Sequence, residues 1–503
     1  MTRTIQAPAT EASKPKPAAR YRGFSQLAFA LLAFALLALA SAQPLIAQTY
    51  VDAAAVWRAT SRLGYGPTAA SAQAASGNPK AWAMHQIGEA YAASRQPPRL
   101  PADVLAFNAP IADIIAGYQS QQVMVRDARK QIVEKNSALA AGSTEVVAKA
   151  ANLQEFSREM AQTASAWRLM SCSDPAMEQP LLARMTEFWF NHFNVSVQKA
   201  SVRPFVGHYV VNAIRANALG KFEDLVLATA HHPAMLFYLD QAQSNARGLN
   251  ENYARELMEL HTLGVNSGYS QNDVRELARI LTGWSVDLPR GESFTFRDRL
   301  HDQGDKTLLG WTFRADGANE GVQAIRMLAR EPATARRIAR RLAETFVADQ
   351  PPQTLVDRIA SSFTNTQGDI RAVMQTLVSS PEFWQTGNTL FKTPMDFACS
   401  ALTAAGGARE KREIQLTQGF LAQAGQPIHG WQTPDGYKTS SATWLAPEAL
   451  TRRADYALAL GARIEEPLYL QPFISPANRE RIAREPAGTR AGLMLASPDF
   501  MSK

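Results

Sequence analysis

Apolar side chains recur at helical spacing along most of the chain. Between Leu181 and Trp189, for example, five apolar side chains fall on one broad stripe of a predicted helix. Alternation of apolar and polar positions, the pattern of a half-buried strand, is rare, and residues 293–296 (Ser-Phe-Thr-Phe) show it best, as one arm of a small hairpin. We therefore expect a mainly α fold, a large multi-helix globular domain with few short strands.

Proline and glycine divide this pattern into elements. Residues 63–67 (Leu-Gly-Tyr-Gly-Pro) predict a turn, and residues 97–101 (Pro-Pro-Arg-Leu-Pro) predict a linker. From Ile111 to Met170 the chain lacks proline and is rich in Gln, Ala, Lys and Glu. That composition favours long, largely solvated helices, with a break near Gly142.

Capping residues mark several helix starts. Ser270, three positions before Asp273, is typical of an N-cap with a capping-box partner. The dipeptide Ser-Pro occurs at residues 380–381 and again at 497–498, each time after an apolar helix. Proline is tolerated at the first position of a helix, so one helix is expected to end at each serine and another to begin at each proline.

The first 42 residues are typical of a targeting segment. A basic leader precedes an uncharged apolar run from Phe24 to Ala40, and residues 40–42 (Ala-Ser-Ala) suit a signal peptidase. Two outcomes stay open, a cleaved signal peptide or a retained signal anchor, because about 17 residues is near the lower limit for spanning a bilayer. The basic side stays cytoplasmic in both cases. We expect the rest of the chain to be exported, either periplasmic or held at the inner membrane by this segment and facing outward.

Charge and cysteine content narrow the function classes. The formal net charge is +7, but residues 1–42 carry five basic and one acidic side chain, so the remainder is close to neutral and nucleic-acid binding is not expected. The two cysteines, Cys172 and Cys399, are too few for a zinc ribbon. They could pair in an oxidising compartment or remain two buried thiols.

The first candidate segment is the helix predicted around Glu187. Glu187, Asn191 and Asn194 follow a spacing of four and three, so they share one face. They form either a polar ridge on a core helix or, with His192, the polar lining of a pocket. Glu187 and His192 are five apart, roughly 140° around a helix, and cannot chelate one metal ion from a regular helix.

The second segment runs from Leu249 to Val265, and its candidate residues are Asn252, Arg255, Glu256, Glu259 and His261. Glu256 and Glu259 are neighbours on a helix, and Arg255 could offset their repulsion. The alternative is that the two carboxylates hold a cation or act as acid and base. His261 is typical of a satisfied core histidine, and its spacing matches neither di-iron bundles nor zinc proteases. The indication of a divalent metal is therefore weak.

The third segment is a polar loop that contains His301, Asp302 and Lys306. Asp302 is expected to turn the loop while His301 reaches another helix. Further along, a cluster of arginines at 336, 337, 340 and 341 accompanies a buried stripe, which indicates a solvated face more than an anion site. No nucleophile elbow, phosphate-binding loop or dinucleotide fingerprint is found.

Six motifs occur in order along the chain: residues 62–66 (Arg-Leu-Gly-Tyr-Gly), 185–193 (Met-Thr-Glu-Phe-Trp-Phe-Asn-His-Phe), 250–265, 281–284 (Leu-Thr-Gly-Trp), His301-Asp302 with Lys306, and 392–394 (Lys-Thr-Pro). Together they resemble the bacterial family called domain of unknown function 1800. The resemblance implies a mainly helical, usually exported protein and brings no activity. Members are often encoded beside a second exported family, domain of unknown function 1501, which implies a partner or a shared pathway.

From these observations we expect residues 53–503 to form a single helical domain, with a helical insertion near 111–165. Glu187, Asn191 and His192 are predicted to meet the second segment in one pocket, with the third segment closing over it. One hypothesis is acid–base or metal-assisted chemistry on a cell-envelope polymer. Its catalytic candidates are Glu187, His192, Glu256, Glu259, His261, His301 and Asp302, and its binding candidates are Asn191, Asn252, Arg255 and Lys306. The other hypothesis is a non-catalytic envelope protein that binds or positions a partner, with the polar residues as a buried network.

Overall fold

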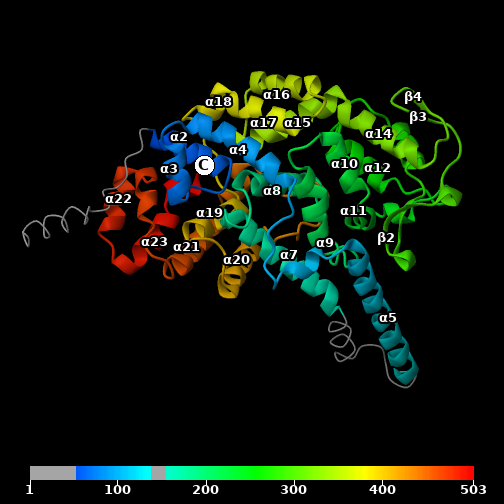
Figure 1. Ribbon diagram of the computed structural model, residues 1–503, viewed down its shortest axis with the longest axis horizontal. Coiled ribbons are helices and arrows are strands. Elements are labelled where there is room, and N and C mark those ends of the chain that lie inside the picture. The colour runs from blue at the N-terminus through cyan, green and yellow to red at the C-terminus, as the bar shows by residue number, and fades with distance from the viewer. Residues whose placement is uncertain (1–51, 137–153) are drawn as a thin grey trace, which may run out of the picture. The chain divides into compact units, whose positions relative to one another are not determined.

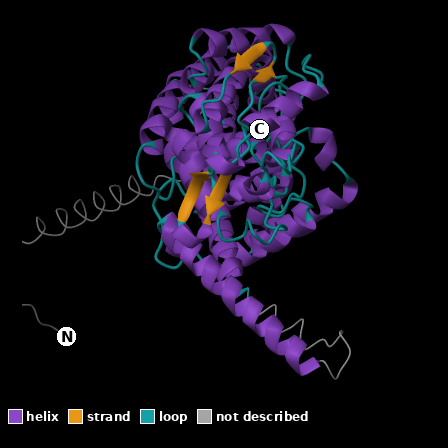
Figure 2. Ribbon diagram, turned by 90° about the vertical axis from the view of Figure 1, so that its right-hand side faces the viewer, coloured by secondary structure: helices purple, strands orange, loops and turns teal. Residues whose placement is uncertain are grey.

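The computed structural model describes residues 52–136 and 154–503, and it is mainly α-helical, as predicted (Figure 1, Figure 2). The first helices are α2 (Ala53–Arg62), α3 (Ala69–Ala75), α4 (Pro79–Ser94), α5 (Ile111–Asn136), α7 (Glu155–Ser173), α8 (Pro180–His192), α9 (Val206–His208), α10 (Phe222–Ala230), α11 (Pro233–Tyr238), α12 (Asn252–Glu256) and α13 (Gln271–Ile280). The later ones are α14 (Ala318–Arg330), α15 (Pro332–Phe346), α16 (Gln353–Asn365), α17 (Ile370–Ser379), α18 (Pro381–Trp384), α19 (Pro394–Ala404), α20 (Lys411–Gln423), α21 (Pro447–Gly461), α22 (Pro476–Ala483), α23 (Ala487–Leu495) and α24 (Pro498–Met501). The described residues all belong to one structural unit, residues 49–503.

The strands form two separate antiparallel hairpins. They are β1 (Trp284–Asp287) with β2 (Glu292–Phe296), and β3 (Lys306–Leu308) with β4 (Trp311–Phe313). The predicted strand at residues 293–296 is therefore confirmed. Both hairpins lie among the helices α10 to α14 in Figure 1, where β3 packs against α13.

Helix α8 passes through the core because apolar side chains surround most of it. Leu181, Met185 and Trp189 are fully buried, and the helix packs against α4 and α7. Pro180 occupies the first position, where its missing N–H costs no hydrogen bond. The candidate residues Glu187, Asn191 and His192 all lie on its last two turns.

The region predicted as long solvated helices contains α5 and α7. Helix α5 extends away from the other helices in Figure 2. For α7 the prediction of a solvated helix is wrong, because its last turns, from Trp167 to Ser173, are buried against α8 and α19. The predicted break near Gly142 lies outside the described residues.

The Ser-Pro connections are confirmed at both places. The side chain of Ser380 accepts the backbone N–H of Phe383 at the start of α18, and that of Ser497 accepts the N–H of Phe500 at the start of α24. The predicted capping box at Ser270 is also present at the start of α13. In each case a local polar side chain satisfies a backbone donor that the first helical turn leaves free.

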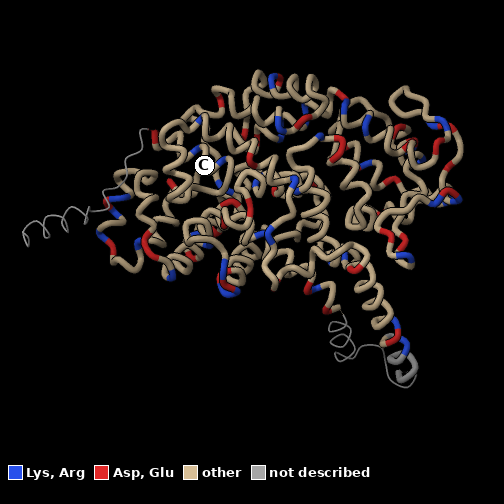
Figure 3. The backbone as a smooth tube through the Cα atoms, in the orientation of Figure 1, with Lys and Arg blue, Asp and Glu red and all other residues tan. Residues whose placement is uncertain are grey.

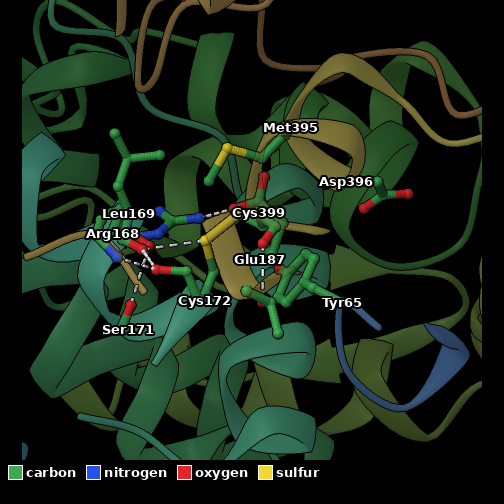
Figure 4. The surroundings of a disulfide bond; sticks show 12 residues. Tyr65, Arg168, Leu169, Ser171, Cys172, Glu187, Met395, Asp396 and Cys399 are labelled. Carbon is green, nitrogen blue, oxygen red and sulfur yellow. Dashed lines mark hydrogen bonds and ion pairs between the residues drawn. A yellow bond between two sulfur atoms is a disulfide. The ribbon is translucent and has the colours of Figure 1, made fainter. Parts of the chain in front are cut away.

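Cys172, near the end of α7, and Cys399, in α19, form a disulfide (Figure 4). Of the two alternatives left open by the sequence, the structure has the cysteines paired. The bond joins positions 227 residues apart in the chain. It connects the helix that carries Arg168 to the helix that carries Asp396.

Within the described part of the chain, no helix is both long enough and apolar enough to cross a membrane. The apolar run from Phe24 to Ala40 lies outside the described residues. Figure 3 shows basic and acidic residues interspersed along the described backbone. Because the two kinds of charge are mixed along the chain, an excess of positive charge at one place has to be explained by the residues of that place.

Candidate functional site

A pocket lies between the end of α8, the end of α15, the start of α19 and the segments that flank them. The space between its side chains, counted together with the solvent at its mouth, is about 690 Å³. Its charged or amide-bearing lining residues are Arg184, Glu187, Asn191, Arg341, Glu344, Asp396, Gln426, Lys438 and Lys503. The pocket thus combines four basic side chains with three carboxylates.

A closed ion cluster forms one wall of the pocket. Arg184 donates two hydrogen bonds to the carboxylate of Asp396, and the Nζ of Lys503 lies 2.5 Å from Asp396 Oδ2. All three side chains are buried. Burial alone would raise the pKa of Asp396, but the two cations outweigh it and hold that pKa well below its usual range. The one carboxylate offsets only one of the two cations, so this cluster keeps an excess of one positive charge, with both cations held by Asp396.

Arg341 lines the same pocket without such a partner. Its guanidinium is half-buried, and among the described residues it makes no ion pair or side-chain hydrogen bond. Burial, and then the charge of the neighbouring Arg337, lower its pKa to about 10. The carboxylates of Glu344 and Asp435 act against this effect, so at neutral pH the pocket presents a positive charge whose nearest counter-charges lie beyond ion-pair distance.

The arginines of α15 correct the sequence interpretation. Arg336 and Arg340 are exposed, as a solvated face requires. Arg337 and Arg341 are not: Arg337 donates two hydrogen bonds to the carbonyl oxygen of Leu260, at 3.0 and 2.9 Å. The two pairs are each four residues apart, so they lie on adjacent faces of the helix, and only one face meets solvent.

Glu344 follows Arg341 on the next turn of α15 and also lines the pocket. Its side chain is half-buried, and no hydrogen bond or ion pair within 4 Å holds it among the described residues. Burial raises its pKa, although Arg340, Arg341 and Arg337 act against that effect. Of the pocket's three carboxylates, it alone combines a raised pKa with freedom from an ion pair.

Glu187 and Asn191, both predicted from the sequence, lie in this pocket. Glu187 pairs with the buried Arg168 of α7, beside the disulfide (Figure 4). Asn191 uses both ends of its amide on the backbone of Tyr437, with bonds of 2.9 and 2.7 Å. Asn194 lies beyond the end of α8, so the prediction that it shares this helix face is wrong, but it donates to the carbonyl oxygens of residues 431 and 433. The polar ridge therefore anchors residues 426–438, here called the strap.

One glycine of the strap explains how closely it approaches α8. Gly436 has φ of +72°, and a Cβ built there would lie 2.1 Å from the carbonyl oxygen of Asn191. A side chain at this position would need both a left-handed backbone and a displaced helix end. The strap thus reaches the pocket because residue 436 has no side chain.

His192 and His261 bring the first and second segments into contact. His192 Nε2 donates to the carbonyl oxygen of His261 at 3.0 Å, and the two rings are 6.2 Å apart. Both are fully buried, and among the described residues His192 Nδ1 and His261 Nε2 have no partner. Burial, then Arg337 and Arg341, lower the pKa of His261 to about 3, so its ring is neutral. These histidines pack behind the pocket and do not line it.

In the second segment, Arg255 offsets the repulsion between carboxylates, which is the first of the two alternatives given for it. Arg255 lies 3.2 Å from Glu251 and 3.6 Å from Glu259. Burial, together with Glu259, raises the pKa of Glu256, and Asn252 is exposed. Across the described residues, no three His, Cys, Asp or Glu side chains are grouped so as to hold a metal ion.

The third segment forms a separate cluster around Glu320 of α14. His301 Nε2 lies 2.9 Å from one oxygen of Glu320, and Lys306 Nζ lies 2.7 Å from the other. All three side chains are buried. As predicted, Asp302 turns the loop by accepting the N–H of Gly304 while His301 reaches another helix. This segment does not line the pocket between α8 and α15.

Replacing Glu320 with glutamine is expected to lower the free energy of unfolding by about 3 to 5 kcal/mol, because the Lys306 ammonium would stay buried without a counter-charge. Denaturant unfolding of the purified protein measures this change. The exposed Glu292→Gln is the matched control and should leave stability within about 0.5 kcal/mol of the parent. Adding Lys306→Met to Glu320→Gln should recover part of the loss. Equal stability of Glu320→Gln and the parent would contradict this assignment.

Sequence reasoning missed several residues of the pocket, namely Arg184, Arg341, Glu344, Asp396, Tyr437 and Lys503. Arg184 and Asp396 are 212 residues apart, and Lys503 and Asp396 are 107 apart. No local pattern connects them. The one available signal was the Lys-Thr-Pro motif, which lies at the start of α19 and ends two residues before Asp396.

Comparison with known proteins assigns the chain to a family. Among curated proteins and among solved structures, no match to the chain is found. The family described as protein of unknown function (DUF1800) matches residues 58–502. The match spans nearly the whole chain and confirms the resemblance seen in the motifs. The chain belongs to the DUF1800 family.

Proposed function

We propose that this protein is an exported envelope protein that binds a small anionic ligand, or the anionic end of a larger one, in the pocket between α8 and α15. The observation that carries the proposal is Arg341, a half-buried guanidinium on the pocket wall without an ion pair or hydrogen bond among the described residues. The other basic residues of the pocket are engaged: Arg184 and Lys503 with Asp396, and Lys438 with Asp435.

A guanidinium in this position favours an anion for two physical reasons. Withdrawing a charge from water without a partner costs free energy, and an incoming anion recovers part of that cost. The planar guanidinium also presents parallel N–H groups that match a carboxylate or phosphate. Asn191 and Lys438 border the same space and add polar contacts.

Export is the second part of the proposal. The disulfide between Cys172 and Cys399 supports it, since such bonds persist in oxidising compartments and are rare in the cytosol. The targeting pattern of residues 1–42 supports it independently. The anionic ligands available in that location include the acidic groups of envelope polymers and the small precursors of those polymers.

Acid–base catalysis is the second candidate function, and Glu344 favours it. Glu187 and Asp396 are each held by a cation, whereas Glu344 has a raised pKa beside Arg341. A carboxyl group of this kind is suited to exchange a proton with a bound ligand. The catalytic hypothesis for the pocket therefore depends on Glu344.

Isothermal titration calorimetry of the full protein with inorganic phosphate tests the binding proposal. Arg341→Gln is expected to weaken phosphate binding by about 10- to 100-fold, the value of a charged hydrogen bond. Glu344→Gln should strengthen it, because a like charge is removed. Without phosphate, the melting temperature of Arg341→Gln should be no lower than that of the parent, because the lost guanidinium makes no ion pair.

Arg336→Gln is the matched control, because it removes the same charge from an exposed position of the same helix. Its phosphate affinity should equal that of the parent at fixed ionic strength. Equal affinities of Arg341→Gln and Arg336→Gln, or no phosphate binding by the parent, would overturn the proposal.

A further inference from the structure

Two opposite charges on neighbouring positions of α15 line the pocket without pairing with each other. Arg341 and Glu344 are separated by a spacing of three, at which helical side chains of opposite charge are neighbours. Each charge acts on the pKa of the other, yet no ion pair within 4 Å joins them, and no other described residue pairs with either. The pocket wall therefore offers one positive and one negative group, each without a direct partner.

Both of these side chains keep contact with solvent. Each is half-buried, and both line the same space, which is about 690 Å³ with the solvent at its mouth included. The other two carboxylates of the pocket, Glu187 and Asp396, are already held by arginines. A cation that enters the pocket can therefore contact Glu344 without displacing a cation of the protein.

A plain anion satisfies only half of this arrangement. It pairs with Arg341, but it also brings a second negative charge towards Glu344, and like charges at short range repel. Burial raises the pKa of Glu344 although three arginines oppose that effect, so its ionised form is disfavoured. A cation in contact with the carboxylate favours the ionised form. A ligand that carries both charges compensates both side chains at once.

We infer that the ligand of this pocket is a zwitterion, with its carboxylate on the guanidinium of Arg341 and its ammonium group on the carboxylate of Glu344. The inference rests on the proposed function, since the ligand carboxylate is the anionic group of that proposal, and it adds the class of ligand: a compact amino acid. The lining has four basic side chains and three carboxylates. A ligand without net charge leaves this near balance unchanged.

The apolar part of the lining indicates the size of this amino acid. Phe188 and Leu390 are buried, Phe391 is half-buried, and all three line the same space. They offer an apolar surface to the carbon atoms between the two charged groups of the ligand. Helical side chains three residues apart have Cβ atoms about 5–6 Å apart. We therefore expect a short spacer, on the order of one to three methylene groups at this separation.

Isothermal titration calorimetry with glycine, β-alanine and γ-aminobutyrate tests this inference, each against the carboxylate of equal carbon number: acetate, propionate and butyrate. At least one amino acid is expected to bind about tenfold more tightly than its matched carboxylate, the value of one charged hydrogen bond. In Glu344→Gln this advantage should disappear, while inorganic phosphate binds at least as tightly as to the parent. A purely structural role of Glu344 would weaken phosphate binding as well.

Two further variants serve as controls. Glu292→Gln removes a carboxylate that is exposed and lies outside the pocket lining, so it should keep the full advantage of the amino acid. Arg341→Gln should weaken the amino acid and its matched carboxylate by a similar factor, because both use the same guanidinium.

The outcomes separate the two proposals. If phosphate binds through Arg341 but no amino acid exceeds its matched carboxylate, the zwitterion is rejected while the proposed function stands. The zwitterion is also rejected if Glu344→Gln keeps the full advantage. If the parent does not bind phosphate, the proposed function itself is wrong, and this inference falls with it.

Discussion

Lowering the pH from 6.5 to 4.5 is expected to remove most of the stability of this protein. His192, His232, His261 and His429 are buried, and burial lowers the pKa of each below the ordinary value of 6.5. Below that value the unfolded chain binds protons that the native protein does not. Stability is therefore fully present above pH 6.5 and is lost as the pH falls towards the native pKa values.

The magnitude follows from the number of histidines. Each one that is protonated only in the unfolded chain contributes a slope of about 1.4 kcal/mol per pH unit. Four of them give roughly 5 kcal/mol per unit, against a typical total stability of about 5 to 15 kcal/mol. Glu256 and Glu344, whose pKa values are raised, oppose this loss, but they do so mainly at more acidic pH.

Denaturant unfolding at several pH values between 7 and 5 measures the slope. His261→Gln should reduce it by about 1.4 kcal/mol per unit, because one buried ring is removed. His85→Gln, whose histidine side chain is 73% exposed, should leave the slope unchanged. A stability that is flat from pH 7 to pH 5 would show that these histidines are not buried as neutral rings.

Reduction of the disulfide is expected to cost roughly 5 kcal/mol of unfolding free energy, the chain-entropy value for a loop of this length. The bond joins α7 to α19 across 227 residues, so cleavage frees a large part of the unfolded chain. It also releases a direct connection between the helices that carry Arg168 and Asp396 (Figure 4). Thermal unfolding with and without dithiothreitol measures the loss.

The double variant Cys172→Ser with Cys399→Ser is the control for that measurement. It should unfold at the temperature of the reduced parent and should not respond to dithiothreitol. Alkylation of the denatured, unreduced parent should modify neither cysteine. Two alkylated thiols, or a parent that is indifferent to reductant, would contradict the pairing.

Local patterns predicted the parts of this fold that local physics decides. The stripe on α8, the capping box at Ser270 and the two Ser-Pro starts depend on side chains within one or two turns, and all are present. The solvated character expected for the end of α7 was wrong because it depends on what packs against that helix. Composition alone does not carry that information.

The candidate site shows the same division. Glu187 and Asn191 were found because one helix face carries them, and they do line a pocket. Arg341 was placed with solvated arginines, since its sequence neighbours Arg336 and Arg340 are indeed exposed. The third segment was expected over the pocket, but the buried Glu320 draws His301 and Lys306 into a cluster of their own. In both cases the deciding partner lies on another element.

The most direct measurement of the central claim is a crystal structure of the protein soaked in selenate, a tetrahedral anion whose selenium is located by anomalous scattering. We expect a selenium peak that marks a bound selenate ion in the pocket bordered by Asn191 and Glu344. The oxygens of that ion should lie within hydrogen-bond distance of the Arg341 guanidinium. A soaked crystal with no peak at Arg341, or with its guanidinium paired to a carboxylate of the protein itself, would contradict the anion site.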